Sequence, residues 1–445
     1  MDTLIVHGGA PLRGEIAVAG AKNVALKAFA SAILTDEEVV IQNVPLIADV
    51  HCMLDVLKSL GIQASIKDHT VQVRSSSLTS TSVPLDVGAR LRTSSLVIGP
   101  LLARYGEARI PNPGGCRIGA RPIDRHIRGL GEMGAEISYH PEDGYFYLRA
   151  TSLHGAVIEF GKNTHTGTEA LMLAAVLAKG ETVLKNAAAE VEVDDLISLL
   201  TTMGANIKRT TEREIVIQGV KKLHGANYSL MPDRNEEVTF ALAAAATHGD
   251  VLVHHSRRAH LEAFLEAFSS AGGQYEAVDA STTRYRQVGP IKPTHIVTMP
   301  HPGFMTDWQA PWALYMTQAN GRSTIHETVF ESRFSYVSEL RKMGAHIEFF
   351  DPPVKNPETF YNFNWSDRRD KYHQGIRITG PTPLHDAVVE IDDLRAGATV
   401  LLAALTAGGT SYIHGVEQID RGYENIEGRF QKLGAPIERK KEDES

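Results

Sequence analysis

A short motif of the form LxxMGAxI recurs along the chain and limits the folds open to it. Clear copies are LGEMGAEIS at 130–138, LTTMGANIK at 200–208 and LRKMGAHIE at 340–348, and a degenerate copy, FSSAGGQYE, covers 268–276. The copies share one glycine each: Gly61, Gly134, Gly204, Gly272, Gly344 and Gly434. Four of the five intervals between these glycines are about 70 residues long, and the last is longer by roughly 20. A recurring interval of this kind predicts a chain built from six related structural units.

Each unit repeats the same order of patterns. An Ala-rich apolar segment, such as ALMLAAVLAKG or TVLLAALTAGG, predicts a helix that is buried nearly all round. A short β-branched run follows, and then an amphipathic helix that ends at the glycine of MGA. A further strand comes after that glycine. The pattern therefore predicts an α/β protein of six βαβαββ-like repeats, with sheets packed outside buried helices.

The six repeats divide naturally into two groups of three. Polar breaks occur in VAGAKNVA, at 18–25, and in SLMPDRNEE, at 229–237, where proline, aspartate and asparagine favour a turn. We therefore expect a first lobe at 22–231 and a second lobe made of 1–21 plus 232–445. The polar, aromatic segment at about 351–375 accounts for the long last interval and is predicted to be an insertion in the second lobe.

Composition excludes several classes of protein. The 445 residues carry a net charge of −8 and no long basic run, so nucleic acid is not an expected partner. Apolar runs such as 170–178 are shorter than the roughly 18 residues that a membrane helix needs, so no membrane association is expected. Two cysteines and no recognisable signal peptide favour a reducing compartment, and we expect a cytoplasmic protein.

The segment PGGCRIGARPID, at 113–124, places Cys116 after two glycines and near Arg121 and Arg125. Neighbouring cations lower the pKa of a thiol, so both a reactive cysteine and a chance structural one stay open from these residues alone. Cys52, which has apolar neighbours, is expected to be buried. The histidines of HHSRRAH, at 254–260, are not expected to bind a metal.

Several motifs together resemble the enolpyruvyl transferases, in particular those that use UDP-N-acetylglucosamine. They are LRGEIAVAGAKN, PGGCRIGARPIDRHIRGL, PHPGFMTDWQA, DDLRAGA and IDRGYENIEGRF, which together span nearly the whole chain. The resemblance implies a fold of two lobes with three repeats each, described as an inside-out α/β barrel. It also implies transfer of the enolpyruvyl group of phosphoenolpyruvate to the 3-hydroxyl of UDP-N-acetylglucosamine, with release of phosphate. That reaction is the first committed step of peptidoglycan precursor synthesis, and it needs neither an organic cofactor nor a metal.

The resemblance also implies roles for individual residues. The substrates are anionic, so fixed cations are needed, and the matching positions are Lys22, Arg92, Arg121, Arg395 and Arg421. Asp307 matches the base that takes the hydroxyl proton, and Asp393 matches a second catalytic carboxylate. Cys116 matches the acid or covalent partner, and Lys22 and Arg395 are counted with the catalytic residues. The remaining matched substrate contacts are Asn23, Pro122, Ile123, Asp124, Arg125 and Val329.

Four positions depart from the family pattern. Asn163 and His165 stand where lysine and serine are common, and Glu237 and Val238 stand where threonine and glycine are common. Two alternatives therefore stay open beside the implied reaction. One is a related transferase that acts on a different nucleotide sugar, and the other is a non-catalytic paralogue that binds a sugar nucleotide.

Overall fold

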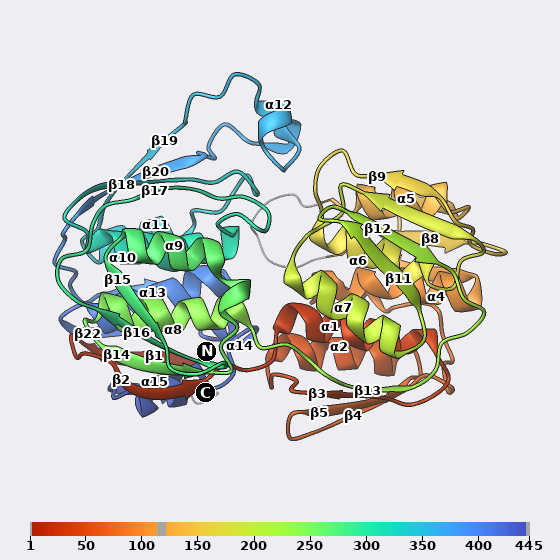
Figure 1. The fold of residues 1–445 in the computed structure, drawn as a ribbon, viewed down its shortest axis with the longest axis horizontal. Helices are drawn as coiled ribbons and strands as arrows, with labels where there is room; N and C mark the ends of the chain where they lie inside the picture. The colour runs from red at the N-terminus through yellow and green to blue at the C-terminus, as the bar shows by residue number, and fades with distance from the viewer. Residues whose placement is uncertain (1, 114–121, 442–445) are drawn as a thin grey trace. The chain divides into compact units, whose positions relative to one another are not determined.

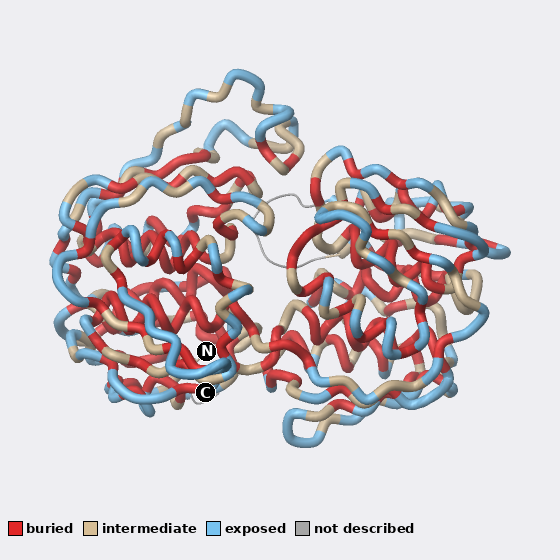
Figure 2. Tube along the Cα trace, in the orientation of Figure 1, coloured by how far each residue is buried: buried red, intermediate tan, exposed pale blue. Residues whose placement is uncertain are grey.

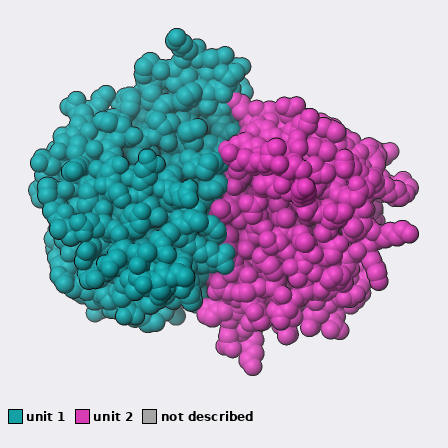
Figure 3. Space-filling view, viewed as in Figure 1, with its two compact units in different colours: residues 1–19, 117–121, 232–445 teal, residues 20–116, 122–231 magenta. Residues whose placement is uncertain are grey.

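The computed structural model describes residues 2–113 and 122–441 and divides them into two compact units. Unit 1 contains residues 2–19 and 232–441, and unit 2 contains residues 20–113 and 122–231 (Figure 3). Each unit has a hydrophobic core of its own. We propose that these units are the two lobes expected from the sequence at 22–231 and at 1–21 plus 232–445.

The strands of unit 2 form three sheets among the described residues (Figure 1). One sheet has the order β13 (Ala226–Ser229), β3 (Val39–Gln42), β5 (Thr70–Arg74), β4 (Gln63–Lys67). The second has the order β6 (Glu107–Pro111), β8 (Tyr145–Arg149), β7 (Glu136–His140). The third has the order β11 (Asn206–Thr211), β12 (Glu214–Gln218), β10 (Glu181–Lys185), β9 (Val157–Glu159).

The strands of unit 1 likewise form three sheets, each with four strands. One has the order β15 (Gly273–Ala277), β16 (Thr282–Gln287), β14 (Asp250–His254), β2 (Arg13–Ala17). The second has the order β17 (His295–Val297), β18 (Gly321–His326), β20 (Gly375–Gly380), β19 (His346–Phe350). The third has the order β21 (Val388–Glu390), β22 (Gly409–His414), β1 (Thr3–Gly8), β23 (Ile437–Lys440).

The sheets follow the predicted βαβαββ repeat. In β9-α6-β10-α7-β11-β12, for example, β9 pairs parallel with β10 across a crossover helix, and the other strands pair antiparallel. The N-terminal strand β1 completes the last sheet by pairing with both β22 and β23. The sheet of β6, β7 and β8 has a single parallel bridge, Ser82 to Arg109, in place of its fourth strand. The prediction of six repeats is confirmed.

The first helix of each repeat is the Ala-rich helix. In unit 2 these helices are α1 (Lys22–Ser31), α4 (Ile98–Tyr105) and α6 (His165–Ala175), and in unit 1 they are α8 (Arg234–Ala246), α10 (Gln309–Thr317) and α13 (Leu394–Thr406). Every residue of α8 and α10 is buried (Figure 2). The three helices of unit 1 contact one another, and each contacts the sheet of its own repeat. The inside-out barrel that the resemblance implies consists of separate sheets packed outside buried helices, and not of one closed sheet.

The second helix of each repeat is amphipathic. These helices are α2 (Ala48–Ser59), α5 (Asp124–Glu132), α7 (Val191–Thr202), α9 (Glu262–Ser270), α11 (Tyr336–Lys342) and α15 (Ile426–Lys432). The repeated glycine follows each of them with φ between 82° and 98°, a conformation that other residues rarely adopt. Cys52 flanks the apolar face of α2 and is only half-buried, so the prediction that it is buried was wrong.

The shorter helical segments lie between these elements. The α-helical ones are α3 (Leu85–Gly88), α12 (Pro357–Phe360) and α14 (Glu417–Asp420). The 3-10 helices are η1 (Ala32–Leu34), η2 (Arg92–Val97), η3 (Arg258–His260), η4 (Thr306–Trp308) and η5 (Trp365–Asp367).

The segment 351–375 is an insertion between two paired strands, as the sequence predicts. Phe350 at the end of β19 lies opposite Gly375 at the start of β20. The chain between them contains α12 and η5 and leaves the body of unit 1 (Figure 1). An aromatic cluster holds it together, because Tyr361 stacks on Trp365 with ring centroids 4.8 Å apart.

Candidate active site

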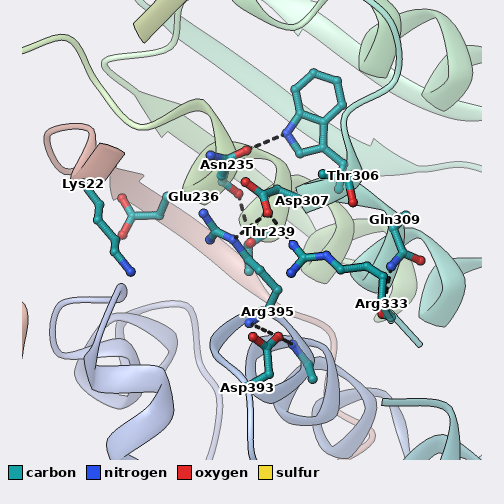
Figure 4. Close-up of polar contacts among 12 residues, drawn as sticks. Lys22, Asn235, Glu236, Thr239, Thr306, Asp307, Gln309, Arg333, Asp393 and Arg395 are labelled. Carbon is teal, nitrogen blue, oxygen red and sulfur yellow. Dashed lines mark hydrogen bonds and ion pairs between the residues drawn. The ribbon is translucent and has the colours of Figure 1, made fainter. Parts of the chain in front are cut away.

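Asp307 lies in η4, directly before the buried helix α10. Its side chain is 23% exposed to solvent. The guanidinium group of Arg333 forms a hydrogen-bonded ion pair with its Oδ1 atom (Figure 4). The Nε atom of Arg395 lies 3.9 Å from the same oxygen. Two cations therefore face one carboxylate, which favours its ionised form, the form that can accept a proton.

Arg395 belongs to the first turn of α13 and is 8% exposed. It donates a hydrogen bond of 2.9 Å to the hydroxyl of Tyr423, and its guanidinium carbon lies 5.4 Å from the centroid of that ring. Burial opposes its charge, but Tyr423, Asp307 and Asp233 outweigh burial and raise the pKa of Arg395. The site therefore holds a permanent buried cation. Burial raises the pKa of Tyr423 as well, although Arg395 opposes that shift.

Asp393 is the N-cap residue of α13. Its Oδ2 atom accepts hydrogen bonds of 3.0 Å from the backbone amides of Arg395 and Ala396. A carboxylate in this position stabilises the helix through both the amides and the helix dipole. The cap also fixes the start of the helix that carries Arg395.

Asn235 ties η4 to the first turn of α8. The indole Nε1 of Trp308 donates a hydrogen bond of 2.9 Å to Oδ1 of Asn235 (Figure 4). Beside it, the guanidinium carbon of Arg234 lies 5.8 Å from the centroid of the Trp308 ring. These contacts hold the residue that follows Asp307.

Val329 and Arg421 occupy other parts of unit 1. Val329 follows β18 by a few residues, and its amide donates a hydrogen bond of 2.7 Å to Oε1 of Glu327. Arg421 lies between α14 and α15, where its guanidinium group reaches Oε1 of Gln418 at 3.4 Å. The structure brings Asp307 and Arg395 together. Arg421 lies in the turn that also carries Tyr423, the hydrogen-bond partner of Arg395.

Lys22 is the first residue of α1 in unit 2. Its Nζ atom forms an ion pair of 2.8 Å with Oδ2 of Asp49, and both side chains are largely buried. Asn23 is the next residue of the same helix turn. The sequence-predicted lysine therefore has a fixed carboxylate partner in α2, which holds its ammonium group in one position.

Arg92 and Arg125 lie in different elements of unit 2 and act on one histidine. Arg92 opens η2, and Arg125 lies in the first turn of α5, after Pro122, Ile123 and Asp124. Both guanidinium groups interact with the ring of His126. Burial, followed by the charges of Arg92 and Arg125, lowers the pKa of His126 to about 4.

Cys116 and Arg121 lie outside the described residues. Their predicted roles rest on the sequence alone.

The positions that depart from the family pattern make internal contacts. The amide of Asn163 donates to the backbone oxygens of Asn186 and Ala187, at 3.2 and 3.1 Å. Buried Glu237 accepts hydrogen bonds from Ser256 and Tyr285, at 2.5 and 2.7 Å. Val238 is fully buried in the core of unit 1.

His165 belongs to a buried ionic triad in unit 2. Its Nε2 atom lies 3.1 Å from Oε1 of Glu169, whose Oε2 lies 3.2 Å from Nζ of Lys27. Burial opposes the charges, but the mutual attraction of the groups lowers the pKa of Glu169 and raises that of His165. The histidine that stands in place of the common serine is therefore paired with the carboxylate of Glu169.

Sequence reasoning missed several residues of these clusters. Arg333 and Tyr423 contact the predicted residues directly, and Asp49 holds Lys22. Arg333 lies in ETVFESRF, the segment that also contains Val329, and Tyr423 lies two positions after Arg421. A pairing between segments so far apart leaves no periodic signal in one sequence.

Within 2–113 and 122–441, no group of three or more His, Cys, Asp or Glu side chains is placed to hold a metal ion. In the same ranges, every helix is too short or too polar to cross a membrane.

The family model for EPSP synthase (3-phosphoshikimate 1-carboxyvinyltransferase) matches residues 6–430. A protein of Acidobacterium capsulatum named UDP-N-acetylglucosamine 1-carboxyvinyltransferase is 44% identical, with 99% of this chain and 96% of that protein covered. A protein of the same name from Magnetococcus marinus is 42% identical, with 99% of each chain covered.

Two solved structures share the fold. The enolpyruvyl transferase NikO from Streptomyces tendae aligns with a TM-score of 0.85 at 23% identity, covering 98% of each chain. EPSP synthase from Acinetobacter baumannii aligns with a TM-score of 0.73 at 18% identity, covering 99% of this chain and 100% of that chain. The six-repeat architecture is thus that of enolpyruvyl transferases. With the match of the family model and the full-length relatives, it follows that the chain belongs to the enolpyruvyl (1-carboxyvinyl) transferase family.

Proposed function

We propose that this protein transfers the enolpyruvyl group of phosphoenolpyruvate to the 3-hydroxyl of UDP-N-acetylglucosamine and releases phosphate, the first committed step of peptidoglycan precursor synthesis. The observation that carries the proposal is the Asp307 carboxylate facing Arg333 and Arg395. Full-length relatives that bear the name of this activity support it. We assign the reaction to the cytoplasm, because only two cysteines in 445 residues favour a reducing compartment.

In the proposed reaction, Asp307 accepts the proton of the sugar hydroxyl while the oxygen forms a bond to C2 of phosphoenolpyruvate. A proton is added at C3, and Cys116 is the proposed donor. Loss of a C3 proton then restores the double bond as the bond from C2 to the phosphate oxygen breaks. Atoms and charge balance without an oxidant, so the proposal includes no organic cofactor, and the fixed cations take the charge-neutralising role that a metal would otherwise have.

The cations and remaining polar residues bind the two substrates in this proposal. Lys22, Arg92, Arg121, Arg395 and Arg421 hold the phosphate and carboxylate groups, because charge-assisted hydrogen bonds are the strongest available for such anions. Asp393 acts as the second carboxylate of the site. The proposed contacts to the nucleotide sugar are Asn23, Pro122, Ile123, Asp124, Arg125 and Val329.

A related transferase acting on another nucleotide sugar is the second candidate. It is favoured by Asn163, His165 and Glu237, which depart from the family pattern and make internal contacts. A side chain already used inside the protein offers less to a ligand, so acceptor choice could differ between this protein and its relatives.

The test is release of inorganic phosphate from phosphoenolpyruvate with a panel of acceptors. The panel contains UDP-N-acetylglucosamine, UDP-N-acetylgalactosamine, UDP-glucose and shikimate 3-phosphate. We expect release with UDP-N-acetylglucosamine and strong loss of it in Asp307→Asn. Asp279→Asn, which changes an exposed turn carboxylate of the same unit, is the matched control. Release with a different nucleotide sugar would favour the second candidate, and binding of UDP-N-acetylglucosamine without any release would indicate a non-catalytic paralogue.

A further inference from the structure

Glu327 is a fully buried carboxylate that the proposed reaction does not use. It follows β18 directly and is 0% exposed. Its Oε1 atom accepts hydrogen bonds from the backbone amides of Val329 and Phe330, at 2.7 and 3.0 Å. Its Oε2 atom accepts a hydrogen bond of 2.9 Å from the hydroxyl of Thr306. These three donors converge on one side chain and favour its ionised form, whereas its burial disfavours that form.

These partners come from the two segments that build the Asp307 ion pair. Thr306 directly precedes Asp307 in η4. Val329 and Phe330 begin the turn that leads to Arg333, whose guanidinium carbon lies 5.7 Å from the centroid of the Phe330 ring. Glu327 therefore links the segment that carries the carboxylate to the segment that carries the cation.

Glu327 also shares the charge of Arg333 with Asp307. Burial raises the pKa of Glu327, and the Arg333 charge is the largest influence that opposes this shift. Tyr336, on α11, is a further titratable group that interacts with Glu327. On the other side, Asp307 faces Arg333 and Arg395. Arg333 thus interacts with both carboxylates, so removing the charge of Glu327 would strengthen the attraction between Arg333 and Asp307.

We infer that Glu327 is a positioning residue for the reaction: it aligns Asp307 with Arg333 and keeps Asp307 basic enough to take the hydroxyl proton. The inference rests on the proposed function for the step it serves. Removing the Glu327 charge strengthens the attraction between Arg333 and Asp307, so Asp307 binds a proton less readily. A weaker base transfers the proton more slowly, and a freed η4 segment places it less accurately.

The central variant is Glu327→Gln, which keeps the size of the side chain and an acceptor for the two amides but removes the charge. In the free protein, carbon NMR of the aspartate carboxyl groups should show the titration midpoint of Asp307 lowered by about 1 pH unit. The signal is assigned with Asp307→Asn. This measurement needs no substrate, so it tests the inference even if the proposed acceptor is wrong.

Turnover provides the second readout. In Glu327→Gln, kcat should fall about tenfold to a hundredfold, with KM for phosphoenolpyruvate nearly unchanged, and the acid limb of the kcat profile should move to lower pH. Thr306→Val keeps the charge and removes one tether, so it should lower kcat while the acid limb stays in place. Glu327→Asp, which restores the charge, should return the Asp307 midpoint towards that of the parent protein.

The matched control is Asp250→Asn. Asp250 is a carboxylate of the same unit that accepts hydrogen bonds from Arg284, at 2.7 and 2.5 Å, rather than from Thr306. It should leave both the Asp307 midpoint and the acid limb unchanged. An unchanged Asp307 midpoint in Glu327→Gln overturns the inference, as does an equal shift in the control. If Glu327→Gln does not fold, Thr306→Val provides the test. An unchanged kcat in that variant would show that the hydrogen bond from Thr306 to Glu327 does not position Asp307, and it would overturn the inference.

Discussion

The environment of His126 gives a prediction whose magnitude follows from the structure. His126 lies in α5 and is 3% exposed. Burial, followed by the charges of Arg92 and Arg125, lowers its pKa from 6.5 to about 4, although Glu169 opposes the shift. The ring is therefore neutral in the folded protein at pH values where it is largely protonated in the unfolded chain.

The sign and size of the effect on stability follow from proton linkage. Above pH 6.5 neither state binds the proton, and this contribution to stability is fully present. As the pH falls from 6.5 towards 4, only the unfolded state gains a proton, so the free energy of unfolding decreases. From the two pKa values, the loss between pH 7 and pH 5 is about 2 kcal/mol, approaching a limit of about 3 kcal/mol at lower pH.

The assay compares the parent protein with His126→Gln in urea unfolding at pH 7, 6 and 5. Glutamine does not titrate, so the difference between the two proteins should change by about 2 kcal/mol over this range, to the disadvantage of the parent. Any packing effect of the substitution is a constant offset. The ring of His126 should also titrate near pH 4 by NMR, with the variant identifying its signal.

A ligand provides an independent check of the cause. If Arg92 and Arg125 bind an anionic group of UDP-N-acetylglucosamine, as proposed, the ligand offsets their charges and should raise the midpoint of His126. A pH-independent stability difference, together with a His126 midpoint near 6.5, would refute the reasoning. It would mean that the ring is accessible to water and distant from both cations.

Three other predictions concern single residues. Arg395→Lys keeps the charge but loses the planar guanidinium group that contacts Tyr423. We therefore expect steady-state kinetics to show kcat/KM for phosphoenolpyruvate lowered roughly tenfold to a hundredfold, which corresponds to about 1.5–3 kcal/mol of transition-state stabilisation. Arg429→Met leaves Glu236 buried without its ion-pair partner and should cost about 3–5 kcal/mol in urea unfolding, part of which a second change, Glu236→Gln, should restore. Iodoacetamide should alkylate Cys116 faster than half-buried Cys52, as peptide mapping by mass spectrometry can show; a faster reaction at Cys52 would argue against an activated thiol.

The sequence predicted the architecture because the architecture is repeated. Six glycines at a nearly constant interval marked six helix ends, and all six adopt the positive φ that the pattern implies. The Ala-rich segments predicted buried helices, since a helix that is apolar all round has no face for water. The insertion at 351–375 was predicted from the one interval that is too long.

The sequence also located part of the candidate site. Asp307 and Arg395 lie in motifs that resemble those of the family, and the structure places them 3.9 Å apart, from Oδ1 to Nε. The roles of Cys116 and Arg121 stay predictions, since both residues lie outside the described part of the chain. Cys52 shows the limit of local reasoning, because apolar neighbours in sequence did not reveal that its own side chain flanks the buried face.

Only the tertiary structure decided how the charges of the site are paired. Arg333 reaches Asp307 across 26 residues, Tyr423 reaches Arg395 across 28, and the hydroxyl of Thr306 reaches Glu327 across 21. Helix and strand periods report which face of one element is buried, and they carry no information about which polar side chain of another element lies opposite. That choice depends on how the repeats pack, because a buried charge is stable only where the packing brings a partner to it.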